Sequence, residues 1–114
     1  NFIKKKKIEI HARSIFLQGA MFMSIPKAKK KIKNKKFILK LNELDNLCAK
    51  NKVRKIDLII NYVQNYKFIK NKLIAPISLK QMNEIISFKH IDLSKFDLKY
   101  LNIKEKKLIN PSFW

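Results

Sequence analysis

The sequence predicts a mainly-α protein, with a small helical body, an extended basic N-terminal arm and little independent core. A chain of 114 residues leaves room for one small domain. Charge runs dominate residues 1–36, whereas apolar residues recur at helical spacings of three and four through residues 37–114. The net charge of +19 opposes compaction of an isolated chain. We therefore expect an arm over 1–36, a helical domain over 37–114, and only partial order in low salt without a partner.

The arm combines dense positive charge with little apolar surface. It carries 12 basic side chains against a single acidic one, Glu9. Ile8 and Ile10 alternate with Glu9, which allows a short strand, while like charges keep residues 4–7 extended. A solvated tail without a target is one interpretation of this segment; its charge density favours contact with a polyanion instead.

A short helix is predicted at the end of the arm, over residues 25–36. Pro26 suits the first turn of a helix. Ile25, Ala28 and Ile32 provide a thin apolar seam on one side. Because such a short helix is marginal alone, it needs a partner to pack against.

Two helices are predicted in the middle of the chain. Asn42 can cap the first, over residues 43–50, with Asp45 three positions later as a short counterpart of the usual capping-box acid. The second has the strongest helical periodicity in the sequence. Its apolar residues are Val53, Ile56, Ile59, Ile60, Val63 and Tyr66.

Two capping patterns predict the last two helices. Ser78 is followed three residues later by a glutamine, which predicts a helix over residues 79–87. Ser94 is followed three residues later by an aspartate, which predicts a helix that ends near residue 107. Pro111 prevents its continuation.

The excess of lysine indicates the kind of polyanion. Of 27 basic residues, 25 are lysines and only Arg13 and Arg54 are arginines. Lysine contacts phosphate as a point charge, whereas forked recognition of base edges favours arginine. We therefore expect nucleic acid bound through its backbone, with a steep dependence of affinity on salt that comes mainly from residues 4–36.

The sequence lacks residues that several classes of functional site require. A single glycine excludes glycine-rich phosphate loops, and a single cysteine, Cys48, excludes internal disulfides and multi-cysteine zinc sites. The apolar residues on either side of Cys48 indicate that its thiol lies in the core. His11 and His90 lie far apart, without a paired nucleophile or carboxylate. We expect no enzymatic activity, no cofactor, no bound metal and no small-molecule substrate.

The longest apolar run, residues 15–23, is too short to span a bilayer. The lysines upstream give it a faint likeness to a signal peptide, but no small-residue cleavage site follows. Docking on anionic lipid through residues 4–7 and this run stays open as an alternative. We expect a membrane to be the less favoured partner.

The last 22 residues resemble the C-terminus of the ribosomal protein fourteen family of the small subunit. Leu93-Ser94-Lys95 is similar to the family's Leu-Ser-Arg, and Lys99 matches a base of the helix that follows. The sequence Leu108-Ile109-Asn110-Pro111 approximates its turn, and Ser112 with Trp114 its ending. Phe113 interrupts the usual Ser-Trp, and the glycine after proline is missing.

The resemblance extends more loosely over residues 45–114. The stretch AKNKVRKIDLIINYVQNY, residues 49–66, is similar to the basic helix that precedes the family's central segment. That segment usually carries an Arg-x-Cys motif or four zinc-binding cysteines, and residues 83–91 have neither. The resemblance therefore implies a zinc-free, organellar form, with residues 1–44 as an extension.

The resemblance also implies a partner and a location. A family member of this kind would be a structural constituent of an organellar ribosome, bound to ribosomal RNA and neighbouring ribosomal proteins in the small subunit. The bias toward Lys, Ile, Asn and Phe is typical of an A+T-rich genome, so we expect the mitochondrial matrix, with a plastid-type organelle as the alternative. Trp114 would enter a pocket of RNA and protein, or fold back on the chain's own helices.

The candidate RNA-binding residues come from the arm, the helix faces and the C-terminus. They are Lys4, Lys5, Lys6, Lys7, Arg13, Lys27, Lys29, Lys30, Lys31, Lys33, Lys35, Lys36, Arg54, Lys95, Lys99 and Trp114. A helical DNA-binding module is the main alternative, since short basic helices also enter the major groove. The scarcity of arginine argues against reading of base edges.

Overall fold

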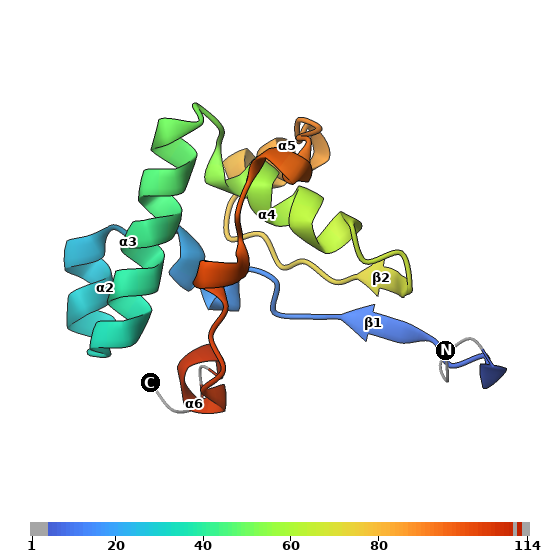
Figure 1. The fold of residues 1–114 in the computed structure, drawn as a ribbon, viewed down its shortest axis with the longest axis horizontal. Coiled ribbons are helices and arrows are strands. Elements are labelled where there is room, and N and C mark those ends of the chain that lie inside the picture. Colours follow the sequence, from blue (N-terminus) through green and yellow to red (C-terminus); the bar gives the residue numbers. More distant parts are fainter. Residues whose placement is uncertain (1–4, 111, 113–114) are drawn as a thin grey trace.

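The computed structural model describes residues 5–110 and 112, apart from the side chain of Tyr100. Helices account for 55% of the chain and strands for 7%, which confirms the predicted mainly-α class. The regular elements, shown in Figure 1, are β1 (Ile10–Ala12), the 3-10 helix η1 (Leu17–Phe22), α2 (Ile25–Lys31), α3 (Lys35–Lys50), α4 (Lys55–Gln64), β2 (Ile69–Lys72), α5 (Leu79–Ile86), the 3-10 helices η2 (Leu93–Lys95) and η3 (Lys99–Leu101), and α6 (Lys106–Ile109).

A two-stranded parallel sheet lies at one end of the molecule. β1 pairs with β2, and the register places Ile10 opposite Ile69 and Ala12 opposite Lys72. The strand expected around Ile8 and Ile10 therefore exists, but it begins only where the lysine run has ended. Figure 1 shows the sheet extending away from the α2–α3 pair, so the basic N-terminal residues project from the body.

The apolar run of residues 15–23 folds into the body. Phe16 and Ala20 are buried, and the chain reverses between them through Gln18 and Gly19, which adopt φ of 53° and 81°. Glycine tolerates this left-handed backbone without a steric penalty. The expected arm is thus extended only in its first part, and its expected end at residue 36 falls inside α3.

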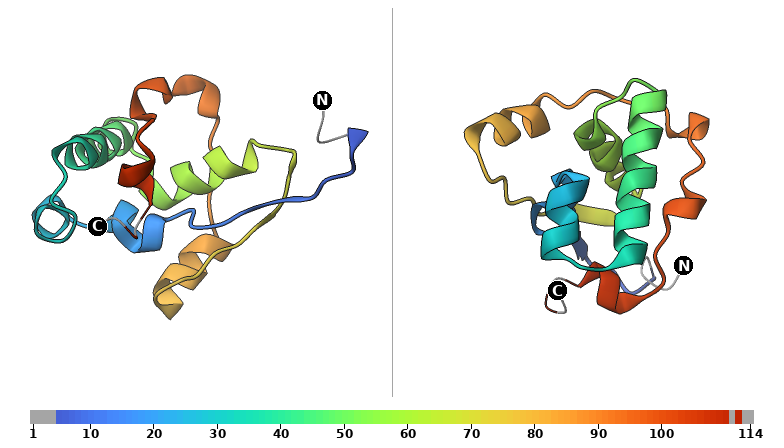
Figure 2. Two further views of the ribbon diagram at one scale, coloured as in Figure 1. Left: turned by 90° about the horizontal axis from the view of Figure 1, so that it is seen from below. Right: turned by 90° about the vertical axis from the view of Figure 1, so that its left-hand side faces the viewer.

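Helices α2 and α3 lie side by side at the other end (Figure 2). Pro26 lies in the first turn of α2, and the seam residues Ala28 and Ile32 are buried, as predicted. The predicted start of the next helix at Asn42 is wrong. Asn34 caps α3 instead, where its side chain accepts a hydrogen bond from the N–H of Phe37 at 3.2 Å.

Helix α4 lies at the centre of the fold and confirms the strongest predicted periodicity. Ile56, Ile59 and Ile60 are buried in one cluster with Phe16 and Ile85. The core consists of three small clusters of this kind. The other two are built around Ala20, Ala28, Ile32, Phe37 and Leu41, and around Leu44, Cys48 and Leu58.

Ser78 caps α5 as predicted, accepting a hydrogen bond from the N–H of Gln81 at 3.1 Å. The return bond differs from a standard capping box, because the Gln81 side chain accepts from the N–H of Ile77 at 2.9 Å. Both ends of this cap are therefore satisfied by side chains.

The helix predicted from Ser94 to about residue 107 is wrong. Asp92, not Ser94, caps a single turn, and Asp97 accepts a hydrogen bond from the N–H of Lys99 at 3.2 Å. Such local bonds from aspartate compete with a continuous helix. The chain instead runs back across α4 and α3 as η2 and η3 (Figure 2), where its apolar side chains pack on the Leu44–Cys48–Leu58 cluster.

Candidate nucleic-acid interface

Helix α2 presents lysines over all of its surface except the seam. Because Ala28 and Ile32 face the core, the four lysines of α2 must occupy the remaining directions around the helix. Each is exposed. Three of them lie in the last turn, where the negative end of the helix dipole stabilises positive charge. Two turns of helix, roughly 10 Å long, thus carry four cationic side chains.

The turn into α3 extends this surface. Lys33 follows the end of α2 with a φ of 54°, and Lys35 and Lys36 begin α3; all three are exposed. Residues 27–36 therefore hold seven exposed lysines on two packed helices. We call this set the α2 ridge: Lys27, Lys29, Lys30, Lys31, Lys33, Lys35 and Lys36.

The carboxylates leave most of this ridge uncompensated. Lys36 pairs with Glu105, whose pKa is lowered by the hydrogen bond from that ammonium group. No other ridge lysine forms an ion pair within the part of the chain that the structure describes. Most other acidic side chains pair elsewhere or cap turns. The ridge therefore keeps a high positive potential and suits an anionic partner.

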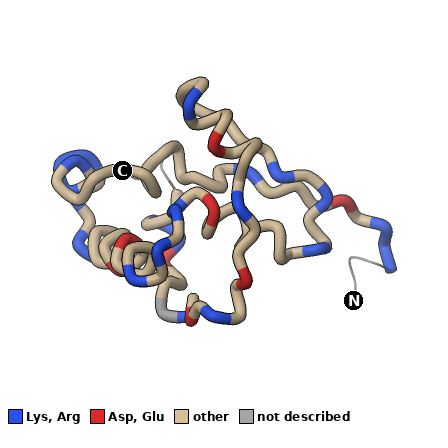
Figure 3. Tube along the Cα trace, turned by 90° about the horizontal axis from the view of Figure 1, so that it is seen from above, with Lys and Arg blue, Asp and Glu red and all other residues tan. Residues whose placement is uncertain are grey.

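A second basic group lies at the opposite end of the molecule. Lys5, Lys6, Lys7 and Arg13 are exposed around β1, and Figure 3 shows Lys and Arg gathered near both ends. Glu9 in this group pairs with Lys70 of β2, which lowers the pKa of Glu9. The molecule measures 45 × 31 × 31 Å, and the two groups lie at opposite ends of it. Lys4 lies outside the described residues.

The remaining predicted residues do not join either group. Lys95 and Lys99 are exposed on the C-terminal segment, in η2 and η3. Arg54 directs its guanidinium at Asp57, which occupies its forked donors. Trp114, the proposed stacking residue, lies outside the described residues. The described members of the predicted set thus lie in four places rather than one: the α2 ridge, the N-terminal group, the C-terminal segment and the start of α4.

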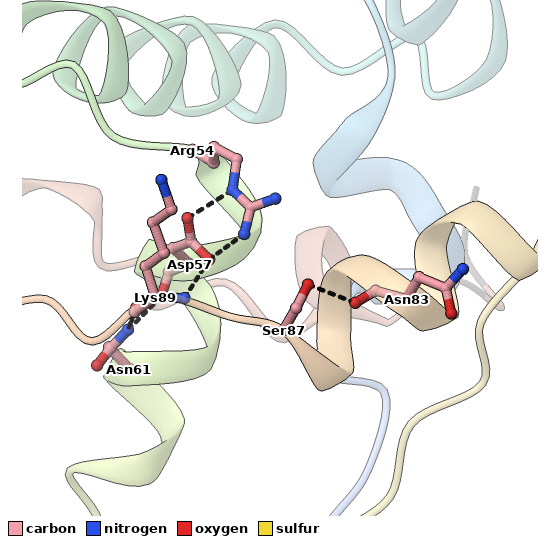
Figure 4. Close-up of polar contacts among 6 residues, drawn as sticks. All are labelled: Arg54, Asp57, Asn61, Asn83, Ser87 and Lys89. Carbon is pink, nitrogen blue, oxygen red and sulfur yellow. Dashed lines mark hydrogen bonds and ion pairs between the residues drawn. The ribbon is translucent and has the colours of Figure 1, made fainter.

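The Arg54–Asp57 pair belongs to a partly buried polar network (Figure 4). Asp57 also accepts the N–H of Lys89 at 2.8 Å. Asn61, one turn on, donates to the carbonyl of Lys89 at 2.8 Å and accepts the N–H of Ile91 at 3.1 Å. These hydrogen bonds connect the backbone of residues 89–91 to side chains of α4. They satisfy backbone groups that would otherwise lack partners within the fold, so the role of the network is structural.

Sequence reasoning missed an exposed aromatic cluster. Tyr62, Tyr66 and Phe68 are 44%, 36% and 46% exposed, although helical spacing had placed Tyr66 on a buried face. The available signal was the stretch YVQNYKFIK, in which Tyr66 and Phe68 are interleaved with Lys67 and Lys70. Tyr62 and Tyr66 line a hollow of about 620 Å³ between α3, α4 and the C-terminal segment, with Lys40 and Lys99 among its other lining residues.

Other chemistry finds little support in the described residues. No group of three or more His, Cys, Asp or Glu side chains is placed there to hold a metal ion. Cys48 is buried in the core as predicted, and burial raises the pKa of its thiol. Over the same residues, no helix has both the length and the apolar character to cross a membrane.

Comparison with protein-family models, curated proteins and solved structures found no match.

Proposed function

We propose that this protein is a structural RNA-binding protein, and that its RNA is the ribosomal RNA of an organellar ribosome. The observation that carries the proposal is the α2 ridge: exposed lysines with almost no carboxylate partners, held on a helix that buries only its seam. An RNA backbone supplies the dense negative charge that this surface lacks.

The proposed mechanism is neutralisation of phosphates on separate RNA segments. Lysine contacts phosphates without regard to sequence and releases condensed counterions when it binds. The N-terminal basic group lies at the end of the molecule opposite the α2 ridge, so each can contact its own RNA segment. The protein would then hold two segments in place, without catalysis.

The assignment to a mitochondrial small subunit rests on the C-terminal resemblance and on the composition. Neighbouring ribosomal proteins are part of the proposal, and an exposed apolar surface on and before α5 suits them. There Ile77, Leu79 and Ile86 are 78%, 77% and 70% exposed. Monomeric proteins rarely leave such a patch uncovered.

The lipid-docking alternative loses its apolar anchor in this fold. Phe16 and Ala20 are buried, so the run of residues 15–23 is not available to insert into a bilayer unless the core opens. The DNA-binding alternative predicts that duplex DNA binds as tightly as structured RNA, so the two affinities are compared at the same salt concentration.

The test replaces charge at matched positions. The ridge variant changes Lys27, Lys29, Lys30 and Lys31 to glutamine, and the control changes the exposed Lys50, Lys52, Lys80 and Lys89 to glutamine. Both lose four charges. We expect the ridge variant to reduce the slope of log affinity against log salt by about 3 for structured RNA, and the control to reduce it by less than about 1.

Four outcomes would count against the proposal. An equal reduction of the salt slope in the ridge and control variants would show that net charge alone determines binding. Wild-type protein would fail to bind RNA at physiological salt, or would bind duplex DNA as tightly, if RNA were not the partner. For the ribosomal part, the protein should co-sediment with the small ribosomal subunit after a high-salt wash, and recovery only in the free fraction would contradict it.

A further inference from the structure

The aromatic cluster of Tyr62, Tyr66 and Phe68 is built as a fixed group. Tyr62 and Tyr66 meet edge to face with ring centroids 5.3 Å apart, and their hydroxyls share a hydrogen bond of 2.8 Å. Tyr66 and Phe68 meet edge to face at 5.7 Å. Edge-to-face contacts hold the rings without stacking them on one another, so ring surface stays available to a ligand.

The cluster is exposed although it lies at the C-terminal end of α4, a helix with most of its residues buried. Its rings keep between a third and a half of their surface in solvent. Solvated aromatic surface of this size is unfavourable, so a partner that covers it would gain free energy.

Charge around the cluster narrows the class of partner. No acidic residue occurs in the sequence between Asp57 and Glu84, and Lys67 and Lys70 flank Phe68. Lys70 is paired with Glu9, so Lys67 is the flanking cation that the proposal uses. Lys99 lines the same hollow as Tyr62 and Tyr66. Flat apolar rings bordered by cations complement a molecule with planar apolar groups and a polyanionic backbone.

We propose that the aromatic cluster stacks unpaired bases of a single-stranded RNA segment, while Lys67 and Lys99 contact its phosphates. This inference rests on the proposed RNA binding and adds a distinct site with its own preference. Aromatic side chains stack on any base through its π-face, but bases within a duplex already stack on each other. The cluster therefore selects single strands, whereas the α2 ridge binds any phosphate backbone.

The experiment removes aromaticity while keeping apolar volume. Tyr66→Leu/Phe68→Leu is compared with wild type, with the ring-preserving Tyr66→Phe, and with Ile77→Ser/Leu79→Ser, which alters exposed apolar surface elsewhere. Binding of single-stranded poly(U) and of duplex RNA is measured at fixed salt, after circular dichroism has verified helix content. We expect the leucine variant to weaken binding of poly(U) roughly 5- to 150-fold for each ring that stacks.

Stacking predicts no change for duplex RNA and a wild-type affinity for Ile77→Ser/Leu79→Ser. For Tyr66→Phe, which keeps the ring, it predicts a much smaller loss of poly(U) affinity than for the leucine variant. A leucine variant that binds poly(U) as well as wild type, while the ridge variant still loses affinity for both RNAs, would overturn stacking and leave the proposed function intact. Equal loss for poly(U) and duplex would also overturn it. Failure of wild type to bind either RNA would overturn both proposals.

A second measurement does not depend on the variants. A poly(U) strand that contains 5-bromouridine is photocrosslinked to the wild-type protein, and the crosslinked peptides are mapped by mass spectrometry. Crosslinks at residues 62–68 support stacking. Crosslinks confined to the α2 ridge, or a cluster that instead captures a protein neighbour and excludes RNA, would refute it.

Discussion

Arg54 and Asp57 form a forked ion pair at the start of α4, in which Nε donates to Oδ2 at 2.7 Å and Nη2 donates to Oδ1 at 2.8 Å. The two residues differ in environment: the Asp57 side chain is 3% exposed, whereas that of Arg54 is 42% exposed. The carboxylate is therefore the member that depends on its partner. Because Asp57 also binds the N–H of Lys89, the pair joins α4 to the segment that follows α5.

Replacing Arg54 should destabilise the fold more than breaking a surface pair. Arg54→Met leaves the buried Asp57 carboxylate with only part of its hydrogen bonds, which we expect to cost about 1.5–3 kcal/mol of unfolding free energy. Lys36→Met breaks the exposed pair with Glu105 and should cost much less, because solvent screens both partners. Urea denaturation of both variants measures the difference; equal losses would mean that the Asp57 site is effectively solvated.

The stability that Arg54 contributes should decline in acid. Burial raises the pKa of Asp57, but the hydrogen bonds from Arg54 and the Lys89 N–H outweigh it, and the pKa lies below its ordinary value. The unfolded state therefore takes up a proton more readily than the folded state. The contribution is complete above about pH 4 and is lost as pH falls through the folded pKa.

The measurement compares wild type with Arg54→Met over a range of acidic pH. The gap in unfolding free energy should be widest above about pH 4 and should narrow on acidification. A gap that stays constant with pH would show that the variant acts through packing rather than through the charge of Asp57.

Tyr62 should titrate at unusually high pH. Its hydrogen bond with Tyr66, together with partial burial, raises the pKa of Tyr62 to about 12. Tyr66→Phe removes that bond, so we expect the pKa of Tyr62 to fall toward the ordinary value of about 10. Ultraviolet absorbance of phenolate at alkaline pH follows the change. Superimposable titrations of wild type and variant, after allowing for one fewer tyrosine, would contradict the hydrogen-bonded cluster.

Local signals predicted the elements that depend on local contacts. Pro26 and the seam behind it gave α2, the periodicity of the isoleucines gave α4, and Ser78 gave the cap of α5. The start of α3 was predicted too late, because Asn34 lies inside a lysine run whose charge pattern is typical of an extended arm. The structure shows that Asn34 instead caps the helix through the N–H of Phe37.

Long-range contacts decided what the sequence could not predict. The capping pattern at Ser94 was overridden because Asp92 and Asp97 bond locally and Leu93, Phe96 and Leu101 find a core cluster across α3 and α4. For the candidate interface, the lysines of α2 were predicted, but the capture of Arg54 by Asp57 needed the fold. The exposure of Tyr66 also follows from the position of α4 in three dimensions, not from its periodicity.

Substitution of two lysines that adopt a left-handed backbone conformation can distinguish an effect on stability from an effect on RNA binding. Lys33 follows α2 and Lys52 follows α3, with φ of 54° and 52°. Glycine is preferred at this position after a helix, because a side chain costs roughly 1 kcal/mol there. We expect Lys33→Gly and Lys52→Gly each to raise the unfolding free energy by about 0.5–1 kcal/mol, as measured by urea denaturation.

Their effects on RNA binding should differ. Lys33 belongs to the α2 ridge, whereas Lys52 lies beyond the far end of α3, a helix of 16 residues and roughly 24 Å. Lys33→Gly should therefore lower the salt slope for structured RNA by about 0.7–0.9, the equivalent of one phosphate contact, while Lys52→Gly leaves it unchanged. If Lys33→Gly raises the stability of the protein and still lowers the slope of log affinity against log salt, unfolding cannot explain the lower slope. Equal slopes for the two glycine variants would remove Lys33 from the interface, because only its position relative to α2 distinguishes it from Lys52.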